Sequence, residues 1–118
     1  MVNNGWKMKE FAFTCCLRSN PQIIAEYDRR HAAVWPEVLF SLRQTGILNA
    51  RIYRLGHRLF MIFQTLDDYD PAAASQRHWN SSPRVREWEE LMASFQERPP
   101  EAPPGVGKWV AMEKVFEM

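Results

Sequence analysis

The chain has 118 residues and a mass of 13.9 kDa, which is the size of one domain, so we expect a single domain over residues 1–118. With 46% hydrophobic and 25% charged residues, its composition is that of a globular protein rather than a disordered or fibrous one. Fifteen basic and fourteen acidic residues leave a net charge of +1, which disfavours nucleic acid and anionic membranes as partners and favours a small ligand.

The first expected elements are a strand and a helix. Apolar and polar positions alternate from Glu10 to Arg18, which is typical of a strand. Asn20 is a suitable N-cap for the following helix, and Pro21 is a suitable first helical residue. Pro36 lacks an amide hydrogen and disfavours helix in the residue before it, so we predict a kink near Trp35 and a second helical segment after it.

A hairpin and a second helical region follow. Two β-rich runs, Ile47 to Leu55 and Arg58 to Thr65, are separated by a two-residue Gly-His connection, which indicates an antiparallel hairpin. The stretch from Pro71 to Gln96 is expected to be helical, with an interruption at Asn80 to Pro83. We therefore predict helix in two pieces after the hairpin.

A proline-rich stretch from Arg98 to Gly107 is expected to be an ordered loop, and Lys108 to Glu117 alternates as a last strand. The order is then β-α-β-β-α-β, the split βαβ arrangement of α+β ferredoxin-like domains.

Such a sheet has helices on one face and leaves the other face open. An exposed apolar face needs a partner, and two copies facing each other through their sheets cover both faces. We therefore predict a homodimer, a dimeric α/β barrel with a pocket between each sheet and its cover. The open-face positions expected at the interface are Phe60, Ile62, Val110 and Met112.

Three features favour a cytoplasmic location. Cys15 and Cys16 are adjacent, which is poor geometry for a mutual disulfide, so we expect both to be reduced. The stretch from Met1 to Glu10 is polar and does not have the pattern of a secretory leader. No run approaches the ~20 apolar residues that span a bilayer.

The segment from Glu26 to Glu37 holds the strongest functional candidates. Tyr27 and His31 are four residues apart, so they share one helix face about 6 Å apart along its axis, and one small ligand can contact both. The unperturbed pKa of histidine, about 6.5, suits proton transfer near neutral pH. The alternative is a Tyr and a His that face the core and are each satisfied by backbone groups.

The pattern Tyr-x-x-x-His-x-x-x-Trp-Pro-Glu, followed by an Asn-x-x-Ile-Tyr strand, is similar to that of the L-rhamnose mutarotase family. The resemblance continues through Arg58–Met61, Trp88, Met92 and the Glu113–Phe116 ending, so it covers nearly the whole chain after Glu10. It implies a mutarotase, an isomerase of carbohydrate metabolism that interconverts the α and β anomers of a free 6-deoxyhexose. It also implies dimerisation through the sheets.

The resemblance assigns roles to particular residues. It places the family's proton donor on His31 and a substrate-contacting tyrosine on Tyr27, and we take Trp88 and Glu89 as further substrate-binding residues. The family has a tyrosine where this chain has Ala50, and a second tryptophan where it has Glu89. These changes alter the sugar-binding wall and favour L-fucose over L-rhamnose.

Ring opening requires a proton delivered to the ring oxygen and another removed from the anomeric hydroxyl, steps that positioned groups accelerate ~10²–10⁴-fold. Neither step needs a metal, nucleotide or redox cofactor, so we expect none. His31, His57 and His78 form no metal-ligand spacing, which disfavours a zinc site. Glu89 and Glu113 are candidates for the opposite base, with an ordinary surface carboxylate as the alternative for each.

Other interpretations stay open. A cofactor-independent monooxygenase-like dimeric α/β barrel protein predicts a broad aromatic pocket and oxygen-dependent turnover, since one fold hosts many chemistries. A non-enzymatic sugar-binding module predicts ligand binding that survives the loss of His31. Arg51 and Arg54 are expected to face solvent, with contact from Arg51 to a sugar hydroxyl as the alternative.

Overall fold

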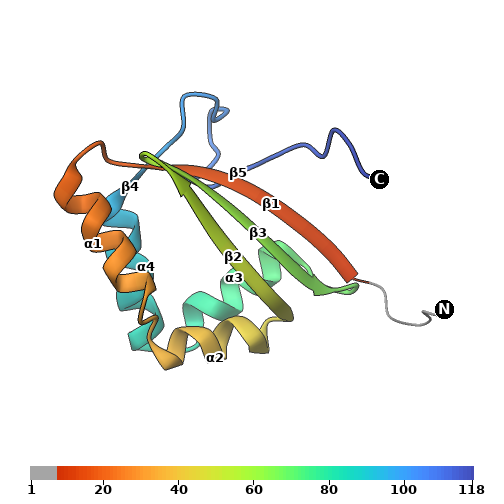
Figure 1. The fold of residues 1–118 in the computed structure, drawn as a ribbon. Helices are drawn as coiled ribbons and strands as arrows, with labels where there is room; N and C mark the ends of the chain where they lie inside the picture. Colours follow the sequence, from red (N-terminus) through yellow and green to blue (C-terminus); the bar gives the residue numbers. More distant parts are fainter. Residues whose placement is uncertain (1–7) are drawn as a thin grey trace.

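The computed structural model describes residues 8–118 (Figure 1). Residues 1–7, which make up most of the stretch judged not to be a leader, lie outside the described residues. The strands are β1 (Met8–Leu17), β2 (Ile47–Leu55), β3 (Arg58–Leu66), β4 (Gln96–Glu97) and β5 (Val110–Ala111). The helices are α1 (Pro21–His31), α2 (Pro36–Gln44), α3 (Pro71–Asn80) and α4 (Pro83–Phe95). None of these helices is long and apolar enough to cross a bilayer.

All strands belong to one antiparallel sheet, in the order β2-β3-β1-β4, with β5 also paired to β1. Two helices connect β1 to β2, and two more connect β3 to β4. The predicted ferredoxin-like arrangement is therefore present, with each crossover divided into two helices.

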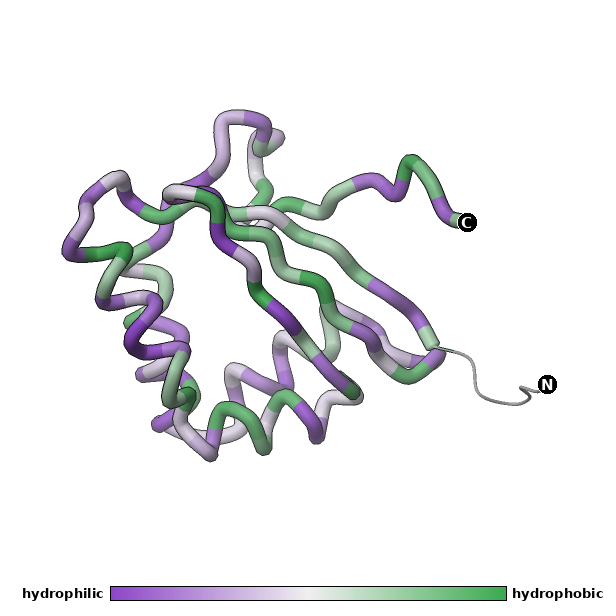
Figure 2. The backbone as a smooth tube through the Cα atoms, in the orientation of Figure 1, coloured by the Kyte–Doolittle hydropathy of each residue, from purple (hydrophilic) through white to green (hydrophobic). Residues whose placement is uncertain are grey.

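The helices cover one face of the sheet and leave the other open (Figure 1). Successive side chains of β3 point to opposite faces of the sheet, so every second one lies on the helix side. Leu59 and Phe63 are on that side and are 0% and 7% exposed. Hydrophobic residues gather along β1 and β3, whereas hydrophilic and hydrophobic residues alternate along β2 (Figure 2). The edge strand β2 is therefore more polar than β1 and β3.

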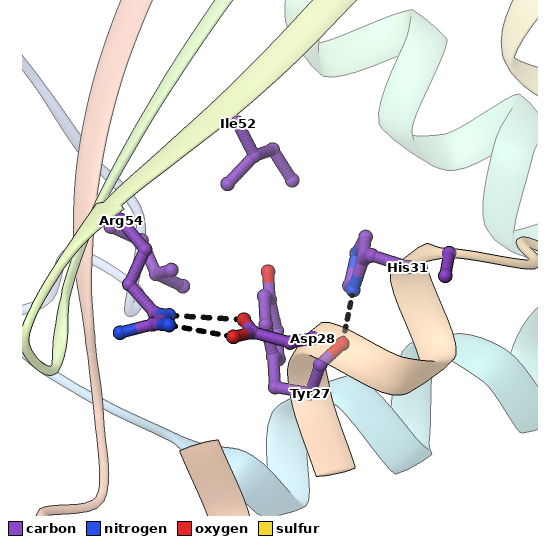
Figure 3. A pocket seen from close by; sticks show the side chains of 7 residues that line it. Tyr27, Asp28, His31, Ile52 and Arg54 are labelled. Carbon is purple, nitrogen blue, oxygen red and sulfur yellow. Dashed lines mark hydrogen bonds and ion pairs between the residues drawn. The ribbon is translucent and has the colours of Figure 1, made fainter. Parts of the chain in front are cut away.

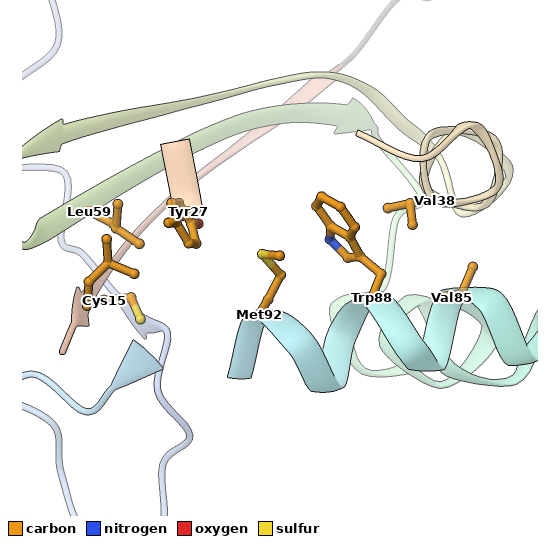
Figure 4. Packing of buried hydrophobic residues seen from close by; sticks show 8 residues of the cluster. Cys15, Tyr27, Val38, Leu59, Val85, Trp88 and Met92 are labelled. Carbon is orange, nitrogen blue, oxygen red and sulfur yellow. The ribbon is translucent and has the colours of Figure 1, made fainter. Parts of the chain in front are cut away.

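The main core lies between the sheet and helices α1, α2 and α4 (Figure 4). It is made of Cys15, Leu17, Tyr27, Val38, Leu59, Val85, Trp88 and Met92. A second cluster under the other end of the sheet contains Phe63, Tyr69 and Ala74. The first cluster holds two of the four candidate site residues, Tyr27 and Trp88, so packing fixes the positions of both.

Helix α1 begins as predicted but ends earlier than the sequence indicated. The Asn20 side chain accepts hydrogen bonds from the amides of Gln22 and Ile23, which confirms it as the N-cap. The predicted kink is instead a break, since α1 ends at His31 and α2 begins at Pro36. Trp35, the residue before the proline, is extended with ψ of 136°, the conformation that proline imposes on its predecessor.

The last strand is much shorter than predicted. Only Val110 and Ala111 form β5, and the alternating stretch to Glu117 does not continue it. The amide of Met112 still bonds to the carbonyl of Ala12, and within residues 8–118 nothing after Met112 pairs with β1. Alternation predicts a strand only where a neighbouring edge is available, and here the chain leaves that edge.

Helix α4 also ends one residue before the predicted limit. Gln96 is extended rather than helical, and together with Glu97 it forms β4 against the end of β1. Gln96 pairs with Leu17 of β1, and both residues are buried.

Candidate active site

A cavity of about 250 Å³ lies between α1 and the edge strand β2 (Figure 3). It is lined by Tyr27, Asp28, His31, Ala32, Ile52, Arg54 and Leu59. This volume is below the ~300–1,000 Å³ of pockets for drug-sized ligands. The cavity therefore suits a small molecule such as a monosaccharide.

His31 stands at the end of α1 with one ring nitrogen engaged. Its Nδ1 lies 3.0 Å from the carbonyl oxygen of Tyr27, one turn earlier (Figure 3). A carbonyl only accepts, so Nδ1 carries the hydrogen, and Nε2 is the nitrogen left to exchange a proton with a ligand. No side chain among residues 8–118 hydrogen-bonds His31.

Burial lowers the pKa of His31 below its usual value, because the charged ring loses solvation. The bond to the Tyr27 carbonyl and the carboxylates of Asp28 and Glu89 act in the opposite direction and favour the charged form. The neutral ring therefore dominates at neutral pH, while nearby acceptors keep the protonated form accessible.

The Tyr27 ring packs against the His31 ring. The two rings stack with centroids 4.2 Å apart and planes 30° apart, and Tyr27 itself is only 3% exposed. Burial raises the pKa of Tyr27, so its hydroxyl stays protonated and can only donate or accept a neutral hydrogen bond.

Two residues not assigned from the sequence, Asp28 and Arg54, form an ion pair on the cavity wall (Figure 3). Arg54 Nε and Nη2 lie 3.0 and 2.6 Å from the two carboxylate oxygens of Asp28, a bidentate arrangement. The pair joins α1 to β2 and presents fixed polar groups to a ligand.

The register of β2 explains this placement. Arg54 and Ile52 pair with Leu59 and Met61 of β3, on the helix side of the sheet, and Ala50 shares that side. Arg51 pairs with Ile62 on the opposite face and lies away from the cavity, whereas Arg54 is exposed to solvent as expected and also lines the cavity. The sequence offered one indication of this position. Arg54 lies four residues after Ala50, where the family has a tyrosine, and side chains four residues apart on a strand share a face.

The Trp88 ring contacts the His31 ring directly, inside the core. It is 3% exposed, and its ring meets the ring of His31 edge-on at 5.4 Å and that of Trp35 at 5.1 Å. The Arg84 guanidinium in turn lies 3.5 Å from the centre of the Trp35 ring. Trp88 therefore fixes the orientation of His31, and its predicted contact with substrate stays a prediction.

Glu89 follows Trp88 on α4 and lies at the edge of the buried face. Its carboxylate accepts a hydrogen bond from His78 Nε2 at 2.9 Å. The other base candidate, Glu113, is exposed beyond β5, and neither Glu89 nor Glu113 lines the cavity. Of the two, only Glu89 is close enough to act on the pKa of His31.

The three histidines lie in different environments. His31 lines the cavity, His57 is exposed in the β2–β3 turn, and His78 is buried on α3. Within residues 8–118, no group of three or more His, Cys, Asp or Glu side chains is arranged to hold a metal ion.

Comparisons with known proteins identify the family of the chain. The sequence pattern of L-rhamnose mutarotase matches residues 10–118. The chain belongs to the L-rhamnose mutarotase family. The resemblance noted in the sequence is thereby confirmed over nearly the full length of the chain.

Individual relatives of this L-rhamnose mutarotase family member carry two sugar names. The chain is 39% identical to the L-fucose mutarotase of Xanthomonas campestris pv. campestris over 94% of its own length and 89% of that protein. It is 30% identical to the L-rhamnose mutarotase of Phocaeicola vulgatus, covering 94% and 99% of the two chains. The crystal structure of the L-rhamnose mutarotase of Formosa agariphila matches with a TM-score of 0.64 at 23% identity, over 93% and 98% of the chains.

Proposed function

We propose that this chain is a single-domain mutarotase that interconverts the α and β anomers of a free 6-deoxyhexose, with His31 as its proton-transferring residue. The observation that carries the proposal is the hydrogen bonding of the two ring nitrogens of His31. Its Nδ1 is tied to the Tyr27 carbonyl, so Nε2 is available to the ligand in a cavity of monosaccharide size. Family membership supplies independent support for a carbohydrate isomerase.

The proposed reaction consists of two reversible proton transfers. Protonated Nε2 of His31 gives its proton to the ring oxygen as the C1–O5 bond breaks, and the anomeric hydroxyl gives its proton to a second group, the base, as its oxygen becomes the aldehyde oxygen. Rotation about C1–C2 presents the other aldehyde face, and ring closure reverses both transfers. Tyr27, Trp88 and Glu89 are the proposed substrate-binding residues, and Arg54 joins them because it lines the cavity.

We infer that L-fucose is exchanged faster than L-rhamnose. Ala50 and Glu89 stand where the family pattern has larger aromatic groups, which leaves more space and one more carboxylate around the distal part of the sugar. The 39% identity to an L-fucose mutarotase supports the same preference. Saturation-difference NMR of equilibrated L-fucose and L-rhamnose with catalytic amounts of protein measures both rates. Equal rates, or faster exchange of L-rhamnose, contradict the preference.

We infer that the enzyme is a homodimer joined through the open sheet faces. Phe60 and Ile62 lie on that face, and Tyr53, opposite Phe60 on β2, is 55% exposed. The C-terminal tail adds Val115 and Phe116, which are 92% and 77% exposed. A second copy of the chain covers this apolar surface without any other partner.

Light scattering at micromolar concentration is expected to give twice the 13.9 kDa chain mass. Ile62→Glu places a charge at the centre of the proposed interface and is expected to yield a monomer. Phe40→Glu is the matched control, because Phe40 is 64% exposed on α2, away from the sheet face. A monomeric wild type, or a dimer unaffected by Ile62→Glu, contradicts the proposed interface.

We also propose a reducing cytoplasm as the location and a monosaccharide as the small-molecule partner. Cys15 and Cys16 are free and buried, and burial raises the pKa of the Cys15 thiol to about 12. These properties fit a protein whose cysteines pack in the core as thiols.

The alternatives are not favoured. The cavity is small and lined by an ion pair and a histidine, which differs from the broad aromatic pocket expected of a monooxygenase-like protein. A non-enzymatic sugar-binding module gives no reason for the free Nε2 of His31.

A further inference from the structure

Three helices contribute a hydrogen-bonded series of side chains beneath the sheet. Ser41 Oγ of α2 lies 2.7 Å from His78 Nδ1 of α3, and His78 Nε2 lies 2.9 Å from Glu89 Oε2 of α4. Ser41 and His78 are 4% and 9% exposed, so water competes little for these bonds. The family resemblance assigned no role to Ser41 or His78.

The hydrogen positions follow from the chemistry of the three groups. An ionised carboxylate only accepts, so Nε2 of His78 carries a hydrogen directed at Glu89. The Ser41 hydroxyl donates to Nδ1 when His78 is neutral and accepts from it when His78 is charged. Nε2 therefore donates to Glu89 in both protonation states, and the carboxylate is held at one oxygen throughout.

Glu89 is half-buried on α4 beside residues that contact the sugar site, and it does not itself line the 250 Å³ cavity. Val85 and Met92, four residues before and three after it, are buried on the face of α4 that meets the core (Figure 4). Its neighbour Trp88 contacts the His31 ring. The negative charge of Glu89 acts to raise the pKa of Tyr27 and of His31, where it opposes the larger effect of burial. Within residues 8–118, Oε1 of Glu89 has no hydrogen-bond partner, so this oxygen is available to a ligand.

A hydrolase uses a serine, a histidine and a carboxylate for a different purpose, and the geometry here does not suit it. Ser41 lies inside α2, where the backbone amides are used in helical hydrogen bonds, so they cannot form an oxyanion hole. The three groups are suited to holding Glu89 rather than to attacking a substrate.

We propose that His78, fixed by Ser41, is a positioning residue that holds Glu89 as the proton acceptor for the anomeric hydroxyl, opposite His31. In ring opening, the O1–H proton passes to Glu89 Oε1, the C1–O5 bond breaks, and O5 takes the proton of His31 Nε2. Ring closure returns both protons. This assignment rests on the proposed mutarotase function and supplies its second proton-transfer group.

A double-mutant cycle on kcat for anomer exchange tests the assignment. His78→Phe removes the donor to Glu89 and keeps a ring, and it is expected to lower kcat about 10-fold with KM changed less than kcat, since misplacing a reacting group costs rate. His78→Gln retains an amide donor and is expected to recover part of this loss. His57→Phe, on the exposed histidine of the β2–β3 turn, is the matched control and should leave kcat unchanged.

The decisive comparison uses Glu89→Gln, which is expected to lower kcat by more than His78→Phe. In that background, His78→Phe should cause no further loss, because His78 acts only through the Glu89 carboxylate. Equal losses in both backgrounds, or unchanged kcat in His78→Phe alone, overturn the positioning role while leaving the mutarotase function standing. A wild-type protein that accelerates exchange of no sugar overturns the function itself.

Discussion

His31→Asn is expected to lower the enzyme-catalysed rate of anomer exchange by ~10²-fold or more, the lower end of what a positioned acid-base group contributes. Asparagine keeps a polar group of similar size at the end of α1, so the fold should persist by circular dichroism. Sugar binding should change much less than the rate, because the proton transfer occurs only in the reacting complex. The rate is measured by saturation-difference NMR after subtracting spontaneous exchange.

Two control variants separate proton transfer from packing. Tyr27→Phe deletes one hydroxyl and keeps the ring stacked on His31, so it should cost about 1 kcal/mol, or roughly fivefold in rate. His57→Asn repeats the same substitution at an exposed histidine and should leave the rate unchanged. A folded His31→Asn protein with wild-type exchange removes the proton-transfer role and leaves His31 as a packing residue.

The pH dependence gives a second signature of His31. The protonated ring is the proton donor, so the rate of ring opening should fall as pH rises through the pKa of His31. Burial lowers this pKa, which places the limb below the usual histidine value of about 6.5. His31→Asn should lack the limb. A wild-type rate that instead rises through the same pH range contradicts the role as donor.

Local patterns predicted most of the fold because most of its elements are determined locally. Asn20 and Pro21 start α1 as expected, and the two-residue turn sets the register of β2 and β3. The last strand was predicted too long because alternation describes a chain's capacity for pairing, whereas pairing also requires the backbone to stay beside a neighbouring strand. Both β4 and β5 pair with β1, and the chain leaves β1 after Met112.

The candidate site was predictable only where one helix carries it. Tyr27 and His31 share a turn of α1, so their spacing alone places them together. Arg54 and Asp28 come from separate elements, and their ion pair depends on which side of the sheet each β2 residue faces. The contact between His78 and Glu89 depends on how α3 crosses α4, which no local pattern in the sequence encodes.

Trp88→Ala is expected to lower the free energy of unfolding by about 3–5 kcal/mol, the usual cost of removing a large aromatic side chain from a core. Trp88 is 3% exposed within the main core cluster, and its ring borders both His31 and Trp35, so a cavity would open between α1 and α4. Urea unfolding followed by far-UV circular dichroism measures the change.

The same substitution at Trp79 is the control, because this side chain is 40% exposed and its removal should change stability by no more than about 0.5 kcal/mol. A native stability of ~5–15 kcal/mol means that Trp88→Ala removes a large share of the total, and the remaining folded protein should exchange sugars slowly because His31 loses its edge contact. A variant that keeps its midpoint in urea would contradict the packing role. A raised KM together with the loss of stability would support the proposed contact of Trp88 with the sugar as well.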